Sequence, residues 1–115
     1  MSDKAWKAFE RRVAEVFGGK RRGAYTGDGA HGKSDVIAPG WGIECKLYTN
    51  PDYDTLLAAA RQAERNRENE SEIPVGVIKR KGGKDSNALV VMRLEVFAEF
   101  FVNQQPRDED KIDVV

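Results

Sequence analysis

The stretch that decides the fold covers residues 34–46 and reads SDVIAPGWGIECK. Two runs rich in β-branched, aromatic and apolar residues, 35–38 and 41–48, lie on either side of the dipeptide Pro39-Gly40. Proline and glycine side by side are typical of a tight turn, and two β-prone runs around such a turn predict a β-hairpin.

Three ionisable side chains lie in this otherwise apolar hairpin. Side chains alternate between the two faces of a strand, so Glu44 and Lys46 should project from one face, while Cys45 should project from the other face into the core. Closure at the turn should bring Asp35 across from the segment that carries Glu44 and Lys46. The sequence therefore predicts that two carboxylates and one ammonium group converge.

Two neighbouring carboxylates repel each other, and a shared divalent cation relieves that repulsion. Magnesium suits the pair of Asp35 and Glu44, because one or two carboxylates, water and phosphate oxygens are its usual ligands. Lys46 could orient or deprotonate an attacking water or stabilise charge on a phosphate. Together these residues indicate metal-assisted hydrolysis of phosphodiesters.

The rest of the chain predicts helices on either side of a small sheet. Apolar residues at helical spacing predict a helix over residues 3–17 that stops at Gly18-Gly19, and a second over 54–69 with Asp52 or Asp54 as its N-cap. Residues 18–33 are interpreted as a glycine-rich connection with a short strand near Tyr25. Further strands are predicted over 74–78 and 88–92, joined by a basic loop over 79–84, and a last helix over 94–102. The expected class is α/β (α+β), a small mixed central sheet flanked by helices.

Composition predicts one soluble domain over residues 1–115, with 104–115 as a flexible acidic tail. The charged N-terminus lacks the apolar core of a secretory signal, so we expect an intracellular, cytoplasmic protein that could be encoded by a phage. Cys45 is the single cysteine, which excludes an internal disulfide and a cysteine-rich zinc site. The net charge of zero gives no general argument for a polyanionic partner.

Two polar residues lie next to apolar helix positions. Glu10 is at the edge of the apolar face of the first helix, where its carboxylate could join the site; alternatively it is a boundary residue whose head group reaches water. Gln62 in the second helix could contact a phosphate or a catalytic residue, or it is simply solvated.

Basic residues are gathered in local clusters that could contact phosphates, although such clusters are often solvated loops. Nothing indicates reading of specific base sequences, so contacts to the backbone of a nucleic acid are expected. The candidates are Lys20, Arg21, Arg22, Lys33, Lys79, Arg80 and Lys81, with Arg61, Arg65 and Lys84 as secondary candidates.

Asp35, Glu44 and Lys46, with Ser34 in the place of proline, resemble the core motif of the PD-(D/E)XK nuclease superfamily. The resemblance covers residues 3–92 and implies a restriction-endonuclease-like αβββαβ core. The small size and the early Glu10 are similar to archaeal and phage Holliday junction resolvases.

That resemblance implies specific roles. Asp35, Glu44 and Glu10 would bind Mg²⁺, with Mn²⁺ able to substitute, and Lys46 would act at the water or the phosphate. The hydroxyl residue that such resolvases often carry after the first helix has Thr26 as its nearest counterpart, and His31 is a solvated loop residue or a phosphate contact.

The expected function is a Mg²⁺-dependent endonuclease acting on branched DNA, as a homodimer with two symmetric sites. Alternatives are a general, nicking or flap nuclease of the same superfamily, and a catalytically silent nucleic-acid-binding module. The apolar residues within 96–102 could form the dimer interface or pack on the sheet of their own chain.

Overall fold

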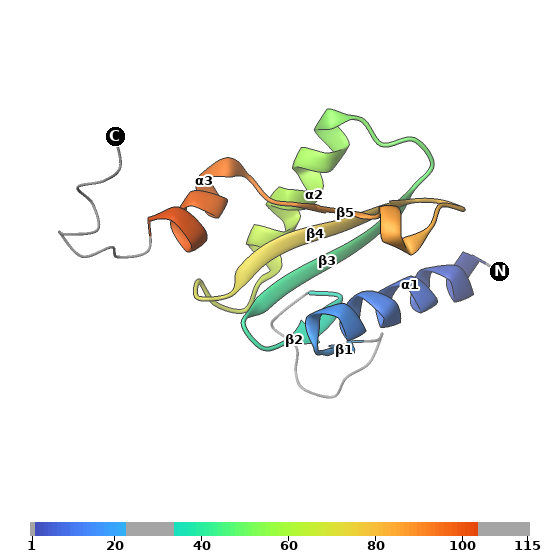
Figure 1. Cartoon of the computed structure of the whole chain (residues 1–115), viewed down its shortest axis with the longest axis horizontal. Helices are drawn as coiled ribbons and strands as arrows, with labels where there is room; N and C mark the ends of the chain where they lie inside the picture. Colours follow the sequence, from blue (N-terminus) through green and yellow to red (C-terminus); the bar gives the residue numbers. More distant parts are fainter. Residues whose placement is uncertain (1, 23–33, 104–115) are drawn as a thin grey trace.

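The computed structural model describes residues 2–22 and 34–103 (Figure 1). Short 3₁₀ and π-helical turns, η1 (Asp85–Asn87) and η2 (Ala98–Val102), flank the last strand and helix. The main elements in chain order are α1 (Ser2–Phe17), β1 (Lys20–Arg21), β2 (Val36–Ala38), β3 (Trp41–Tyr48), α2 (Tyr53–Asn66), β4 (Ile73–Arg80), β5 (Leu89–Val91) and α3 (Leu94–Phe97). The predicted α/β class and the order αβββαβ are confirmed.

The strands form one mixed sheet in the order β1-β2-β3-β4-β5. Only β3 and β4 are parallel, and α2 makes the connection between them, as parallel neighbours require. The other neighbouring pairs are antiparallel. The long strands β3 and β4 therefore form the centre, where side chains are covered on both faces.

The predicted hairpin consists of β2 and β3. Gly40 has φ of +86°, a left-handed conformation that glycine adopts without steric cost, and this closes the turn after Pro39. In the resulting register Ala38 pairs with Trp41 and Val36 pairs with Ile43. This register sets which β3 side chains lie beside the start of β2.

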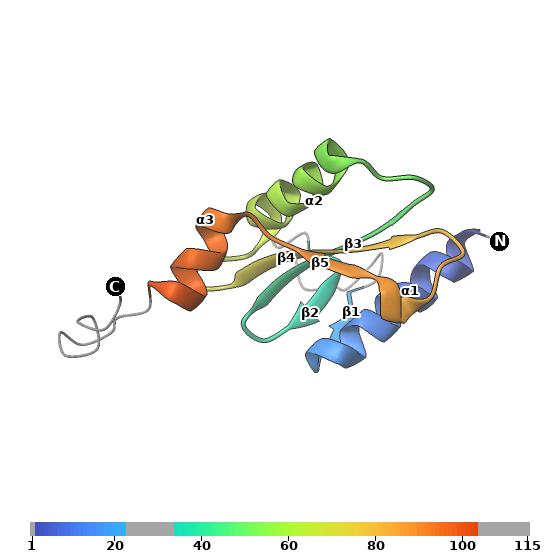
Figure 2. The same ribbon diagram turned by 45° about the horizontal axis from the view of Figure 1, so that its top comes forward.

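Helices α1 and α2 cover opposite faces of the sheet (Figure 2). Phe9 and Val13 of α1 pack in the main core with Ile43, Cys45 and Val77. On the other face α2 approaches closely, because a Cβ atom on Gly76 would lie 3.3 Å from the Cβ of Ala59. Cys45 thus lies in the core as predicted.

Several boundaries differ from the sequence-based prediction. A two-residue strand, Lys20–Arg21, lies within the predicted connection. The predicted strand near Tyr25 lies outside the described residues, as do Thr26, His31, Lys33 and the tail 104–115. Helix α2 ends at Asn66 rather than at residue 69, because Arg67 has an extended backbone and its guanidinium donates to the carbonyl oxygen of Glu72. Lys79 and Arg80 belong to β4 rather than to a loop.

The apolar C-terminal segment is only partly packed. Val96 is buried, whereas Phe97 and Phe101 are 43% and 45% exposed and stack against each other with ring centroids 5.2 Å apart. None of the helices in the described part of the chain has the length and apolarity needed to cross a bilayer.

Candidate active site

Asp35 lies immediately before β2 and is anchored to β3 through both its backbone and its side chain. Its amide donates to the carbonyl oxygen of Ile43 at 2.8 Å, and its Oδ2 accepts a hydrogen bond of 2.7 Å from the amide of Cys45. Burial raises the pKa of the Asp35 carboxyl, and the Cys45 amide partly offsets that effect. The hairpin therefore holds this carboxyl in a fixed position beside the middle of β3.

Glu44 is the central residue of the site. It is 2% exposed, and its Oε2 accepts a hydrogen bond of 3.1 Å from the side-chain amide of Asn66. The carboxyl groups of Glu44 and Asp35 lie close enough that each affects the pKa of the other. Burial, followed by the negative charge of Asp35, raises the pKa of Glu44 to about 7. Burial and the neighbouring charge of Asp35 therefore favour the protonated form of Glu44 up to about neutral pH.

Lys46 lies two residues beyond Glu44 on β3 and is half-buried. Its positive charge lowers the pKa of both Asp35 and Glu44, so the ammonium group lies near both carboxyls. The predicted convergence of two carboxylates and one ammonium group is thus present, and it has the hairpin geometry that the sequence indicates.

Glu10 lies inside the protein and is bound by an arginine. Its Oε1 accepts a hydrogen bond of 2.7 Å from Nε of Arg21, and the two side chains are 3% and 20% exposed. The interpretation of Glu10 as a boundary residue that reaches water is therefore wrong. Burial raises its pKa, and the charge of Asp35 raises it further, so Glu10 lies within electrostatic reach of the carboxyl pair.

The donor set fits a magnesium ion held by two carboxylates and completed by water or phosphate oxygens. The hydrogen bonds from Cys45 and Asn66 each engage one oxygen, which leaves a second oxygen on Asp35 and on Glu44. Across residues 2–22 and 34–103, no three His, Cys, Asp or Glu side chains are gathered as a ready metal site. The role of Glu10 as a third ligand stays a prediction, and Arg21 already engages one oxygen of its carboxylate.

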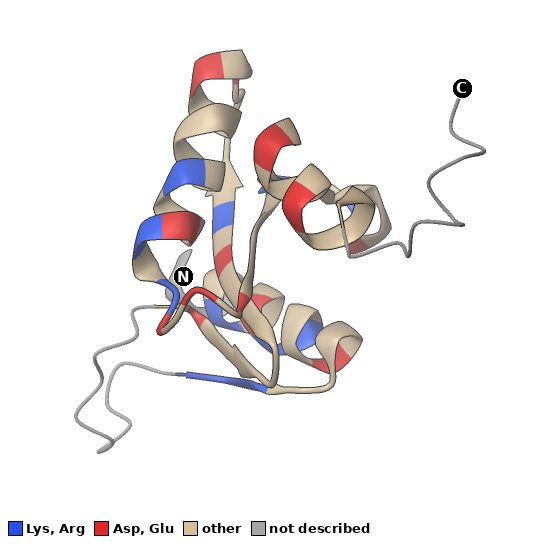
Figure 3. Cartoon of the chain, turned by 90° about the vertical axis from the view of Figure 1, so that its left-hand side faces the viewer, with Lys and Arg blue, Asp and Glu red and all other residues tan. Residues whose placement is uncertain are grey.

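Lysines and arginines are spread over several helices and strands (Figure 3), and the basic candidates differ in their exposure and contacts. Lys20 is exposed on β1, and Arg80 and Lys81 are exposed at the end of β4. Arg22 donates from Nε to the carbonyl oxygen of Ser34 at 2.6 Å and lies 3.6 Å from a Glu68 oxygen.

Lys79, by contrast, is held by contacts with other residues of the protein. Its Nζ donates to Asp85 at 2.7 Å and lies 5.1 Å from the centroid of the Phe9 ring. The side chain is only 13% exposed. Within the described residues, Lys20, Arg80 and Lys81 are thus the exposed members of the first group of basic candidates, and the secondary candidates Arg61, Arg65 and Lys84 are exposed as well.

Asn66 is a site residue that the sequence analysis did not identify. It lies one helical turn after Gln62, the predicted residue, for which the structure gives a half-buried position. Residues four apart in a helix lie on the same side, so the helical period that directed attention to Gln62 would equally have indicated Asn66. Which of the two reaches Glu44 depends on how α2 packs along β3.

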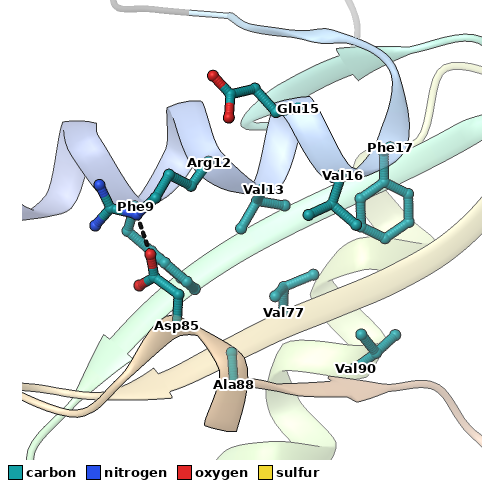
Figure 4. Close-up of a pocket in the computed structure, with 10 residues that line it drawn as sticks. All are labelled: Phe9, Arg12, Val13, Glu15, Val16, Phe17, Val77, Asp85, Ala88 and Val90. Atoms are coloured by element: carbon teal, nitrogen blue, oxygen red, sulfur yellow. Dashed lines mark hydrogen bonds and ion pairs between the residues drawn. The ribbon is translucent and has the colours of Figure 1, made fainter.

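A separate apolar hollow lies between α1 and the strands β4 and β5 (Figure 4). Phe9, Val13 and Val77 line it, and an ion pair between Arg12 and Asp85 lies at its side. Because these residues lie on the face that α1 covers, the hollow is distinct from the site around Glu44.

In comparisons with models of known protein families, with curated proteins and with solved structures, nothing matches this chain. Arguments about its function therefore depend on the side chains and their geometry.

Proposed function

We propose that this chain is a metal-dependent endonuclease that hydrolyses DNA phosphodiester bonds. One observation carries the proposal: Asp35 and Glu44 hold their carboxyl groups together inside the protein, and Glu44 has a pKa raised to about 7. Such a pair is unfavourable unless a proton or a cation lies between the two groups. A site of this kind is matched to a divalent metal ion, and perturbed carboxyls of this kind are common at catalytic sites.

The residues around the pair have separable roles. Asp35 and Glu44 would hold Mg²⁺, or Mn²⁺ in its place, and the bound ion would lower the pKa of a water and stabilise charge on the phosphodiester. The amide of Cys45 and the side chain of Asn66 orient the two carboxylates. Lys46 supplies a positive charge beside them, where it would orient the water or interact with a phosphate oxygen.

The proposed substrate is DNA, with branched DNA preferred, as the resemblance to junction resolvases implies. Exposed Lys20, Arg80 and Lys81 supply positive charge on a chain whose net charge is zero. A homodimer accompanies this proposal, because two symmetric cuts across a junction need two sites related by a two-fold axis. The exposed rings of Phe97 and Phe101 are the proposed contact between copies.

The test is cleavage of an end-labelled four-way junction and of a linear duplex with the same sequence, in Mg²⁺ or in EDTA. Wild type is compared with Asp35→Asn, Lys46→Ala and the control Asp54→Asn, which makes the same chemical change at an exposed position in the first turn of α2. Asp35→Asn and Lys46→Ala are each expected to lower the cleavage rate by about 100-fold or more, because a positioned acid, base or charge contributes roughly that factor. Thermal unfolding of each variant checks that the fold is kept.

The outcomes separate the alternatives. Symmetric cuts that need Mg²⁺ and Asp35, and that persist with excess duplex competitor, support a junction-selective nuclease. Equal cutting of both substrates supports a general, nicking or flap nuclease. No cutting in Mg²⁺ or Mn²⁺, together with binding that is indifferent to metal, overturns the enzymatic proposal in favour of a binding module.

A further inference from the structure

A cavity of about 200 Å³ lies next to the carboxyl pair, between β2, the hairpin turn and the loop that follows α2. Ser34 lines it and directly precedes Asp35 in the chain. Arg22 also lines it, and the Arg22 amide donates to the carbonyl oxygen of Asp35 at 2.9 Å. The cavity therefore adjoins the proposed catalytic site without sharing its carboxylates.

The hydroxyl group of Ser34 is the strongest sign that this cavity has a ligand. Ser34 is 4% exposed, and its Oγ is the one buried side-chain nitrogen or oxygen within the described part of the chain that has no hydrogen-bond partner. A buried hydroxyl without a partner is destabilising, and nearly all such groups in proteins are hydrogen-bonded. A ligand that reaches Ser34 would supply the missing partner.

The charges around the cavity disfavour a phosphate. Glu68 and Glu72 line one side, and the Glu72 Oε1 accepts a hydrogen bond of 2.8 Å from the Glu68 amide. With Arg22 they give the lining a net charge of −1. The carboxylates can only accept hydrogen bonds, whereas the arginine and the serine hydroxyl can donate them. A neutral ligand with both a donor and an acceptor edge suits this arrangement.

The size of the cavity and its apolar walls further restrict the kind of ligand that fits. The rest of the lining is apolar and consists of Val36, Ile37, Ala38, Pro39 and Trp41. The volume of about 200 Å³ is several times the roughly 30 Å³ that one water molecule takes in the liquid, and it is below the roughly 300 Å³ where pockets for drug-sized ligands begin. One flat heterocycle between apolar walls with polar groups at its edge fits these limits.

We propose that the cavity binds an unstacked nucleobase with an exocyclic amino group, from the DNA strand next to the cleaved phosphodiester. This inference rests on the proposed nuclease function. Adenine, cytosine and guanine carry such an amino group to donate to Glu68 or Glu72, and thymine does not. Unstacking a base costs least where the base is already unpaired, so this site would favour branched over continuous duplex DNA.

Trp41 provides a direct readout of occupancy that does not depend on cleavage. A Trp6→Phe background removes the other tryptophan, whose side chain is exposed, and leaves Trp41 as the only one. We would titrate this protein in EDTA with single-stranded DNA tetranucleotides of deoxycytidine and of thymidine, called here the cytidine and the thymidine oligomer. The expected result is saturable quenching of Trp41 fluorescence, with a Kd for the cytidine oligomer about fivefold or more below that for thymidine, because the thymine edge lacks the amino group.

Matched variants locate the binding. Glu72→Gln keeps an acceptor for the Glu68 amide but loses its charge, and it should weaken binding of the cytidine oligomer by about fivefold. Glu70→Gln makes the same change at an exposed position outside the cavity lining and should leave the Kd unchanged. If both variants instead change the Kd equally, only the overall charge of the protein matters, which overturns the proposed site.

Ser34→Ala distinguishes a ligand site from a packing feature. Removing an unsatisfied hydroxyl should raise the Tm of the free protein, while loss of the donor weakens binding of the cytidine oligomer severalfold. Unchanged binding in this variant, or equal affinity of wild type for the two oligomers, overturns the proposal.

The two proposals can fail separately. If the protein cleaves junctions but its Trp41 fluorescence gives the same Kd for both oligomers, the nuclease function stands and the base site is refuted. Discrimination without any cleavage would refute the nuclease function and retain the base site.

Discussion

The side-chain amide of Asn66 donates a hydrogen bond of 3.1 Å to Oε2 of Glu44, and this bond joins the end of α2 to the middle of β3. Glu44 is almost completely buried, so its orientation depends on such contacts. Because the second oxygen of Glu44 is the one available to a cation, Asn66 is expected to position a metal ligand and not to touch the substrate.

Replacing Asn66 by alanine should therefore weaken Mg²⁺ binding and cleavage together. Loss of a hydrogen-bond partner of a metal ligand typically costs about 10- to 100-fold in affinity or activity. The measurement is the Mg²⁺ dependence of the cleavage rate. Gln62→Ala, one helical turn earlier on α2, is the matched control and should change it little. A larger loss from Gln62→Ala than from Asn66→Ala would refute the assignment of Asn66.

The raised pKa of Glu44 predicts how the stability of the metal-free protein depends on pH. The pKa is about 7 in the folded protein, against an ordinary value of 4.5. Between these values the folded state retains a proton that the unfolded state has released, so the free energy of unfolding falls as the pH rises from 4.5 to 7. Over that interval the free energy of unfolding falls by about 3 kcal/mol, and above pH 7 it stays at this lower value.

Urea unfolding in EDTA at pH 5 and pH 8 measures this loss. Glu44→Gln removes the titrating group and should show a much smaller fall over the same range, whereas Glu99→Gln, an exposed change of the same kind, should behave as wild type. Adding Mg²⁺ at pH 8 should restore stability to wild type but not to Glu44→Gln. Identical pH profiles for wild type and Glu44→Gln would contradict the raised pKa.

Local chemistry explains why the hairpin could be predicted from the sequence. Gly40 takes the left-handed conformation at the turn, and Gly18, with φ of +73°, ends α1 as its position after the apolar run indicated. The alternation of side chains along β3 then determines that Glu44 and Lys46 share a face. These features depend only on neighbouring residues, which is why the carboxyl pair and its lysine were predictable.

Features that depend on tertiary packing were not predictable. Strand β1 has only two residues, both charged, and its strand conformation comes from pairing Lys20 with Ile37 and Arg21 with Val36. The cavity beside Ser34 likewise forms only when the loop after α2 folds over β2. No short-range pattern in the sequence encodes either contact.

The ion pair between Arg21 and Glu10 predicts a structural role for an arginine that was expected to contact phosphates. Arg21→Ala leaves the buried Glu10 carboxylate without its partner and should lower the free energy of unfolding at pH 7 by about 2 kcal/mol, less than for a fully buried pair because Arg21 keeps some exposure. Arg11→Ala, at an exposed position in α1, is the control.

A double-mutant cycle completes this test. Glu10→Gln in the Arg21→Ala background should recover part of the lost stability, because the buried negative charge is removed. If Arg21→Ala unfolds at the same urea concentration as wild type but binds DNA less tightly, Arg21 acts on the phosphates and the structural role is wrong.

Two adjacent basic residues of β4 should have different roles: Arg80 in DNA binding and Lys79 in the stability of the fold. Arg80 is exposed and pairs in register with Tyr48, two residues beyond Lys46 on the same face of β3, whereas Lys79 is held by Asp85 beside the Phe9 ring. Arg80→Ala should lower DNA affinity and reduce the slope of log K against log salt concentration by about one, the change expected for one lost phosphate contact. Lys79→Ala should leave that slope unchanged and lower the Tm.

Fluorescence anisotropy with labelled junction DNA at several salt concentrations measures the slopes, in an Asp35→Asn background that prevents cleavage. Thermal unfolding of the same proteins gives the Tm values. The two residues are neighbours in sequence and both are basic, so a difference between them can only come from the face of the sheet on which each side chain lies. A reduced slope with an unchanged Tm for Lys79→Ala would mean that the Asp85 ion pair opens to release this lysine to the DNA.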